Sequence, residues 1–298
     1  AEAHNNLGVT LHDLGQLDAA VKSYEQALAI KPDYAEAHNN LGGTLQELGQ
    51  LDAALKSYEK ALAIFIFADK PGYAEAFNNL GIVLKELGEL DTAVNSYEKV
   101  LAIKPDFAEA HFNLALTLQE LGQLDDAVKS YKQALAIKPD YDDAYTNLGV
   151  TLQELGQLDD AVKIFEEAVA IKPDFAEAHF NLGVMLQELG QLDTAAKSYE
   201  QALAINSDYP EAHNNLGITI KDLGQPDAAV KCYEQALAIK PDYAEAHNNL
   251  GITIKDLGQP DAAVKCYEQA LAIKPDYAEA HNNLGNALKN LGQLGAAV

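Results

Sequence analysis

Leucines recur along the chain with the spacing of a buried helix face. In residues 1–34, Leu7, Leu11 and Leu14 are four and three residues apart, which places them on one side of an α-helix. Residues between them are mostly polar or small, as expected for a helix that buries a single stripe. The pattern predicts a first helix over roughly residues 2–14.

A second helix is predicted directly after the first. Gly15 is the residue type that commonly follows a helix end, and Asp18 is the expected N-cap of the next helix. Apolar residues at helical spacing then continue to Ile30, and Pro32 prevents further helix. The segment therefore predicts two helices joined by a short turn.

The same pattern repeats along the chain, so each residue can be given a position within its repeat. The repeats are 1–34, 35–73, 74–107, 108–141, 142–175, 176–209, 210–243, 244–277 and a partial 278–298. One helix pair cannot bury its apolar face alone, whereas stacked pairs bury a continuous core. The prediction is one all-α domain over 1–298, an α-solenoid of stacked antiparallel helix pairs.

The residues at the best-defined positions resemble the tetratricopeptide repeat. In the first repeat they are His4, Leu7, Gly8, Ala20, Tyr24, Ala27 and Pro32. The resemblance implies a right-handed superhelix of about one turn, with the first helices lining a concave groove. It is similar to the superhelical repeat domain of O-linked N-acetylglucosamine transferases, which implies that such an array recruits protein substrates.

Asparagine occupies position 6 of every repeat, on the helix side opposite the leucines. The row is Asn6, Asn40, Asn79, Asn113, Asn147, Asn181, Asn215, Asn249 and Asn283. An amide side chain both donates and accepts hydrogen bonds, so it can bind a peptide backbone without reading its side chains. The row predicts a peptide-binding surface; recent duplication of the repeat is the alternative.

Acidic and aromatic residues flank the asparagines. Position 2 is acidic throughout, and position 13 is acidic in eight repeats. We expect Glu36, Glu109 and Glu177, with Phe112 and Phe180 at position 5, to contact a peptide. The net charge is −24, and all 21 basic residues are lysines, which argues against nucleic-acid and anionic-membrane binding. A basic peptide is the expected partner; a solvated acidic face is the alternative.

No motif indicates an enzyme, a cofactor or a metal. Seven of the eight histidines lie at position 4, too far apart in stacked repeats to share one zinc ion, so they are interpreted as packing residues. Cys232 and Cys266 are expected to be reduced, which suits a cytoplasmic protein. The predicted function is a non-enzymatic protein-binding scaffold; the alternatives are a recruiting module of a larger transferase and a self-assembling array.

An insert at 65–69 and the last repeat depart from the pattern. The second helix of residues 35–73 is expected to continue to about Ala68, and Phe65, Ile66 and Phe67 cannot all face the core. They predict packing within the chain, a contact with a partner or second copy, or an incidental tolerated loop. The chain is expected to be a fragment that packs end to end through exposed Leu284, Leu288 and Leu291.

Overall fold

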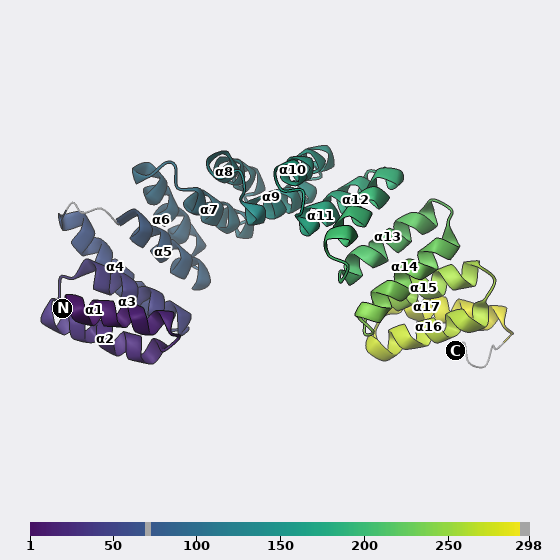
Figure 1. Ribbon diagram of the computed structural model, residues 1–298, viewed down its shortest axis with the longest axis horizontal. Helices are drawn as coiled ribbons and strands as arrows, with labels where there is room; N and C mark the ends of the chain where they lie inside the picture. Colours follow the sequence, from purple (N-terminus) through teal and green to yellow (C-terminus); the bar gives the residue numbers. More distant parts are fainter. Residues whose placement is uncertain (69–72, 293–298) are drawn as a thin grey trace. The chain divides into compact units, whose positions relative to one another are not determined.

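The computed structural model describes the backbone of residues 1–68 and 73–292 and the side chains of residues 1–65 and 74–292. The regular structure of these residues is α-helical (Figure 1), as predicted. The helices are α1 (Glu2–Asp13), α2 (Leu17–Ile30), α3 (Ala35–Glu47), α4 (Leu51–Ala68), α5 (Tyr73–Glu86), α6 (Leu90–Ile103), α7 (Ala108–Glu120), α8 (Leu124–Ile137), α9 (Asp142–Glu154), α10 (Leu158–Ile171), α11 (Ala176–Glu188), α12 (Leu192–Ile205), α13 (Pro210–Asp222), α14 (Pro226–Ile239), α15 (Ala244–Asp256), α16 (Pro260–Ile273) and α17 (Ala278–Asn290).

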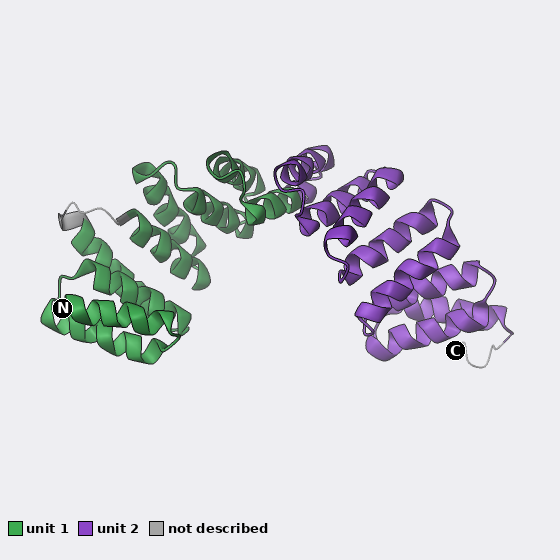
Figure 2. Ribbon diagram, viewed as in Figure 1, with its two compact units in different colours: residues 1–151 green, residues 152–298 purple. Residues whose placement is uncertain are grey.

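The chain forms two compact units, residues 1–151 and residues 152–298, shown in Figure 2. The boundary falls within α9. Within each unit odd-numbered helices pair with the even-numbered helix that follows them, as α3 does with α4 and α11 with α12, and odd-numbered helices such as α1 and α3 also contact one another. The odd-numbered helices therefore form a row within each unit. That the two units make one continuous superhelix stays a prediction.

Glycine ends the first helix of each repeat, as predicted. Gly15 has a φ of 71°, a left-handed conformation that glycine adopts without steric cost, and its equivalents behave alike. The predicted N-cap is wrong, however. Gln16 occupies the cap position of α2 without a side-chain hydrogen bond, and Asp18 lies inside the first turn. There its charge is favoured by the helix dipole.

In six repeats the core is a tyrosine ring packed onto a glycine. Tyr24, in α2, is almost fully buried, and a Cβ atom added to Gly8 would lie 2.5 Å from its ring. Ala20 and Ala27 complete the contact with no exposed surface. Small residues at these positions let the paired helices approach each other around the tyrosine ring.

The helix α4 extends to Ala68, as predicted for the insert. Phe65 is only 4% exposed, which favours packing within the chain for this residue. The side chains of Ile66 and Phe67 lie outside the described residues, so their contact with a partner stays a prediction.

The last described helix corrects one expectation. Leu288 is 7% exposed rather than free for end-to-end packing, and Leu284 packs against the cluster of Tyr267 and Ala287. Exposed leucines instead lie in the first repeat, where Leu7 in α1 is 49% exposed and Leu14 at the end of α1 is 66% exposed.

Candidate peptide-binding groove

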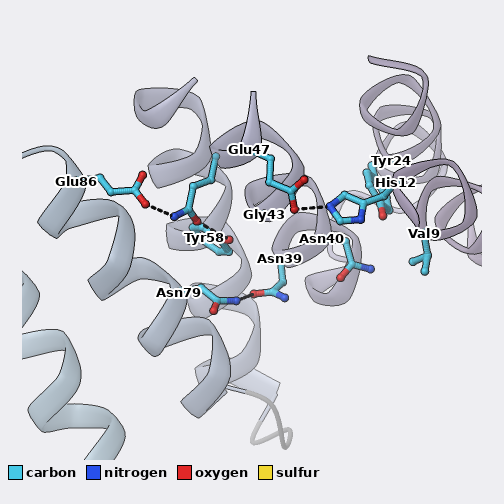
Figure 3. A pocket seen from close by; sticks show the side chains of 11 residues that line it. Val9, His12, Tyr24, Asn39, Asn40, Gly43, Glu47, Tyr58, Asn79 and Glu86 are labelled. Carbon is cyan, nitrogen blue, oxygen red and sulfur yellow. Dashed lines mark hydrogen bonds and ion pairs between the residues drawn. The ribbon is translucent and has the colours of Figure 1, made fainter. Parts of the chain in front are cut away.

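The predicted groove face of the odd-numbered helices lines a hollow of about 560 Å³ in the unit 1–151. Its walls include the side chains at positions 6, 9 and 13 and those at positions 5 and 12 beside them. Val9, Asn40, Glu47 and Glu86 belong to this lining and face a common space in Figure 3. The lining includes the predicted groove positions except position 2, and peptide binding at these positions stays a prediction.

A smaller hollow of about 350 Å³ repeats this arrangement in the unit 152–298. It is lined by Val184, Gln187, Glu188, Tyr199 and Asn215, which occupy positions 9, 12, 13, 24 and 6 of their repeats. The same face is thus concave in both units.

The asparagines at position 6 also hold successive repeats together. In five repeats the Nδ2 group donates to the Oδ1 of the position-5 asparagine in the preceding repeat. The bonds are Asn40 to Asn5 (3.1 Å), Asn79 to Asn39 (3.4 Å), Asn113 to Asn78 (3.2 Å), Asn249 to Asn214 (3.0 Å) and Asn283 to Asn248 (3.0 Å). We call these bonds the amide ladder; one of them is drawn in Figure 3.

The amide ladder is interrupted where position 5 is not asparagine. Phe112 offers no acceptor, and Asn147 in the next repeat donates instead to the carbonyl of Asp143 at 2.7 Å. Phe180 likewise precedes Asn215, whose Oδ1 accepts from the neighbouring Asn214 at 3.2 Å. Neither asparagine donates to the Oδ1 of a preceding asparagine. Asn215 lines the smaller hollow and makes a side-chain hydrogen bond with Tyr199 of the preceding repeat.

A second set of contacts joins position 12 to position 13 of the next repeat. His12 lies 2.8 Å from Glu47, and Gln46 donates to Glu86 at 2.7 Å (Figure 3). Lys85 pairs with Glu120 at 2.7 Å, and Gln153 donates to Glu188. Because glutamine is neutral, Glu86 and Glu188 keep their negative charge in the groove. Sequence reasoning identified the acidic row but missed these partners.

Position 2 belongs to a separate cluster with the lysine at position 31. Glu75 lies 3.6 Å from Lys104, Glu211 lies 3.4 Å from Lys240, and Glu245 lies 3.6 Å from Lys274. The same lysines stand over the aromatic ring at position 34. Six such pairs have Nζ-to-centroid distances of 4.4–5.2 Å: Lys31–Tyr34, Lys104–Phe107, Lys138–Tyr141, Lys172–Phe175, Lys240–Tyr243 and Lys274–Tyr277. Sequence reasoning did not find this cluster.

The two predicted groove phenylalanines each join an aromatic group. Phe112 lies 4.8 Å from Tyr141, and Phe180 lies 4.8 Å from Tyr209, as distances between ring centroids. Burial raises the pKa of both tyrosines to about 12, and nearby carboxylates add to the effect. Glu109 and Glu177 are among these carboxylates, and their contact with a peptide stays a prediction.

The histidines at position 4 bind the loop before their helix. In six repeats Nε2 lies 2.9–3.1 Å from the backbone carbonyl of position 32, as for His38 and Pro32. A carbonyl only accepts, so Nε2 must carry the proton. This contact gives the row a structural role. Among the described residues, no three histidine, cysteine or acidic side chains gather as a metal site.

Family models for tetratricopeptide repeats match the chain from residue 10 to residue 292. One of them, described as TPR repeat, matches residues 10–49, 118–156, 153–190, 185–224, 219–258 and 254–292, and two described as Tetratricopeptide repeat match 33–106 and 96–129. The chain belongs to the tetratricopeptide repeat family. Its fold and its helix pairs are those expected from the sequence.

Solved structures agree with this assignment. A crystal structure of MamA is 27% identical, with a TM-score of 0.51 over 56% of this chain and 97% of that one. YrrB, described as a TPR protein with an unusual peptide-binding site, is 23% identical, with a TM-score of 0.52 over 62% and 96%. A tetratricopeptide repeat protein from Parabacteroides merdae is 16% identical, with a TM-score of 0.58 over 85% and 98%.

No curated protein matches the chain in sequence. The described helices include none with the length and apolar character needed to cross a membrane. The family supports a scaffold for protein–protein interaction, while the compartment and the partner stay predictions.

Proposed function

We propose that this tetratricopeptide repeat protein binds an extended, basic peptide along the groove face of its odd-numbered helices. The observation that carries the proposal is that both compact units form a hollow lined by the same repeat positions, with amides beside carboxylates. An amide of the ladder uses one N–H for the neighbouring repeat, and its second N–H remains for a peptide backbone.

The charge of the groove favours a basic peptide. The chain carries 45 acidic against 21 basic residues, and Glu86 and Glu188 receive only neutral glutamine partners. A field of one sign raises the encounter rate with ligands of the opposite sign. The described peptide-binding site of YrrB is a property of that protein, and peptide binding by the present chain rests on its own groove residues.

The best test uses asparagines outside the amide ladder. Asn147, Asn181 and Asn215 lack the bond to a preceding asparagine, so changing all three to alanine spares that contact between repeats. We expect at least tenfold weaker binding of a labelled, side-chain-acetylated hexalysine peptide, because each lost hydrogen bond costs about 0.5–1.5 kcal/mol. The peptide carries no side-chain charge, so it reports backbone binding.

Asn95 provides a matched control. Its Nδ2 donates to the carbonyl of Asp91 at 2.9 Å, the same local bond that Asn147 makes, but on an even-numbered helix. Asn95→Ala should leave peptide affinity unchanged, as measured by fluorescence anisotropy. Unchanged affinity in the triple variant as well would refute the backbone-binding role.

Self-association is a second candidate function, favoured by the exposed Leu7 and Leu14 of the first repeat. Sedimentation velocity across a hundredfold concentration range distinguishes the two. Oligomers that disappear on changing both leucines to serine, while peptide affinity is retained, would support a separate assembly surface.

A further inference from the structure

One repeat lacks the lysine that the others place over their aromatic ring. In residues 176–209, position 31 is Asn206, while the acidic residue at position 2 and the aromatic residue at position 34 are both present as Glu177 and Tyr209. Six other repeats supply a lysine from this position, with Nζ 4.4–5.2 Å from the ring centroid. The chain itself therefore shows where an ammonium group belongs in this cluster.

Asn206 does not take the place of the lysine. Its side chain turns back to its own loop, where Oδ1 accepts a hydrogen bond from the backbone N–H of Asp208 at 3.1 Å. Tyr209 is half-buried and has Phe180 as its aromatic neighbour, and Glu177 is exposed. Among the described residues, Glu177 has no ion-pair partner.

The repeat 108–141 shows that a phenylalanine and a lysine can contact one such ring together. Phe112 and Tyr141 are 4.8 Å apart with an interplanar angle of 36°, and Phe180 and Tyr209 are 4.8 Å apart with an angle of 35°. Lys138 nevertheless stands 4.4 Å from the Tyr141 centroid. The ring pair of Phe180 and Tyr209 has the same geometry, but no lysine at position 31 contacts the Tyr209 ring.

We propose that Tyr209, Phe180 and Glu177 bind the side-chain ammonium group of a lysine in a partner protein. The partner's lysine takes the place held by position 31 in other repeats, with the Tyr209 ring beneath it and the Glu177 carboxylate beside it. Ammonium–aromatic contacts and exposed ion pairs are individually weak, so this site selects a residue within a longer peptide. The proposal rests on the proposed groove function and identifies one side chain that the groove reads.

Asn206→Lys tests the site by supplying the lysine from the protein itself. The backbone already fits, because Asn206 has φ −128° and ψ 96°, against −124° and 89° for Lys138. The variant should lower the affinity for unmodified hexalysine about fivefold at 150 mM salt. It should leave the acetylated hexalysine unchanged, because acetylation removes the charge that the site recognises.

Two controls separate the site from general effects. Gln201→Lys adds the same charge at an exposed position of α12 and should change hexalysine affinity less than twofold. Asn206→Ala removes the bond to Asp208 without adding a cation and should bind as the wild type does. Equal affinities of Asn206→Lys and Gln201→Lys for hexalysine would overturn the lysine site.

The converse variant makes a second site. Lys138→Asn should remove the lysine from the Tyr141 ring and raise the affinity for hexalysine about fivefold. No increase would count against the ring and the Glu109 carboxylate being sufficient. The groove proposal and the lysine site can be refuted independently. If the triple asparagine variant binds acetylated hexalysine normally while Asn206→Lys weakens the binding of hexalysine, the lysine site is supported and backbone binding by the asparagines is refuted.

Discussion

Replacing Tyr267 by phenylalanine removes a hydroxyl group from the core of α16 and should stabilise the protein. The Tyr267 side chain has no exposed surface, and its hydroxyl has no hydrogen-bond partner among the described residues. Tyr199 occupies the same repeat position and is equally buried, but its hydroxyl donates to Gln187 at 2.8 Å. The two residues form a natural matched pair that differs in the partner.

The difference arises at position 12 of the same repeat. A glutamine at this position accepts a hydrogen bond from the tyrosine hydroxyl. The Tyr131 hydroxyl, for example, donates to Oε1 of Gln119 at 2.9 Å. Lysine, which has no acceptor, stands at position 12 of the Tyr267 repeat as Lys255. A buried hydroxyl without a partner costs about 1–3 kcal/mol, whereas a satisfied hydrogen bond contributes about 1 kcal/mol.

Tyr267→Phe should therefore raise the free energy of unfolding by about 1 kcal/mol, and Tyr199→Phe should lower it by about 1 kcal/mol. Lys255→Gln should also stabilise the protein by about 1 kcal/mol, but only while the Tyr267 hydroxyl is present. The double variant Lys255→Gln/Tyr267→Phe therefore completes a thermodynamic cycle. Phe165 at the same position of another repeat is fully buried, which shows that the fold accepts the ring without the hydroxyl.

Native-state hydrogen exchange is the appropriate assay, because repeat arrays need not unfold in one step. Exchange of amides in α16 reports the Tyr267 variants, and exchange in α12 reports Tyr199→Phe. If both tyrosine variants destabilise their helices equally, or if Lys255→Gln has the same effect with and without the Tyr267 hydroxyl, the reasoning is refuted.

Two further predictions concern packing and pH. Gly42→Ala should lower the free energy of unfolding by about 1–3 kcal/mol, because its Cβ atom would lie 2.8 Å from the Tyr58 ring. Gly43→Ala should cost less, because its Cβ atom would lie 3.4 Å from the Tyr58 hydroxyl. Urea denaturation measures both variants, and equal costs would contradict the ring contact. Burial raises the pKa of Tyr141, Tyr209 and Tyr243 to about 12, which favours the neutral form in the folded state. The stability that the raised tyrosine pKa values contribute is fully present below about pH 10 and is lost as the pH rises towards about 12. The urea midpoint of unfolding should therefore fall above about pH 10. A midpoint that stays constant to about pH 11.5 would contradict the tyrosine burial.

The helices were predictable because each depends on local spacing. Leucines every three or four residues, a glycine at the turn and a proline after the second helix act within a few residues of one another. The N-cap was mispredicted for the same reason: Asp18 is a good capping residue type, but the turn places Gln16 at the helix start.

Contacts between repeats were not predictable from a single helical wheel. The amide ladder joins Asn40 to Asn5 across 35 residues. The contacts between positions 12 and 13 join His12 to Glu47 across 35 residues as well, although the repeat is 34 residues long. Both sets show the same offset of one residue between successive odd-numbered helices. Polar pairs separated by 35 residues were the sequence signal that would have revealed these contacts.

The amide ladder changes what the repeated asparagine means. Where position 5 of the preceding repeat is asparagine, position 6 is explained by the stability of the stack and needs no ligand. Asn147 and Asn215 follow Phe112 and Phe180 and lack that reason, yet they are still asparagine. An asparagine costs a few tenths of a kcal/mol against alanine inside a helix. The peptide-binding argument therefore rests most strongly on Asn147, which bonds only within its own helix, whereas Asn215 also bonds Tyr199 of the preceding repeat.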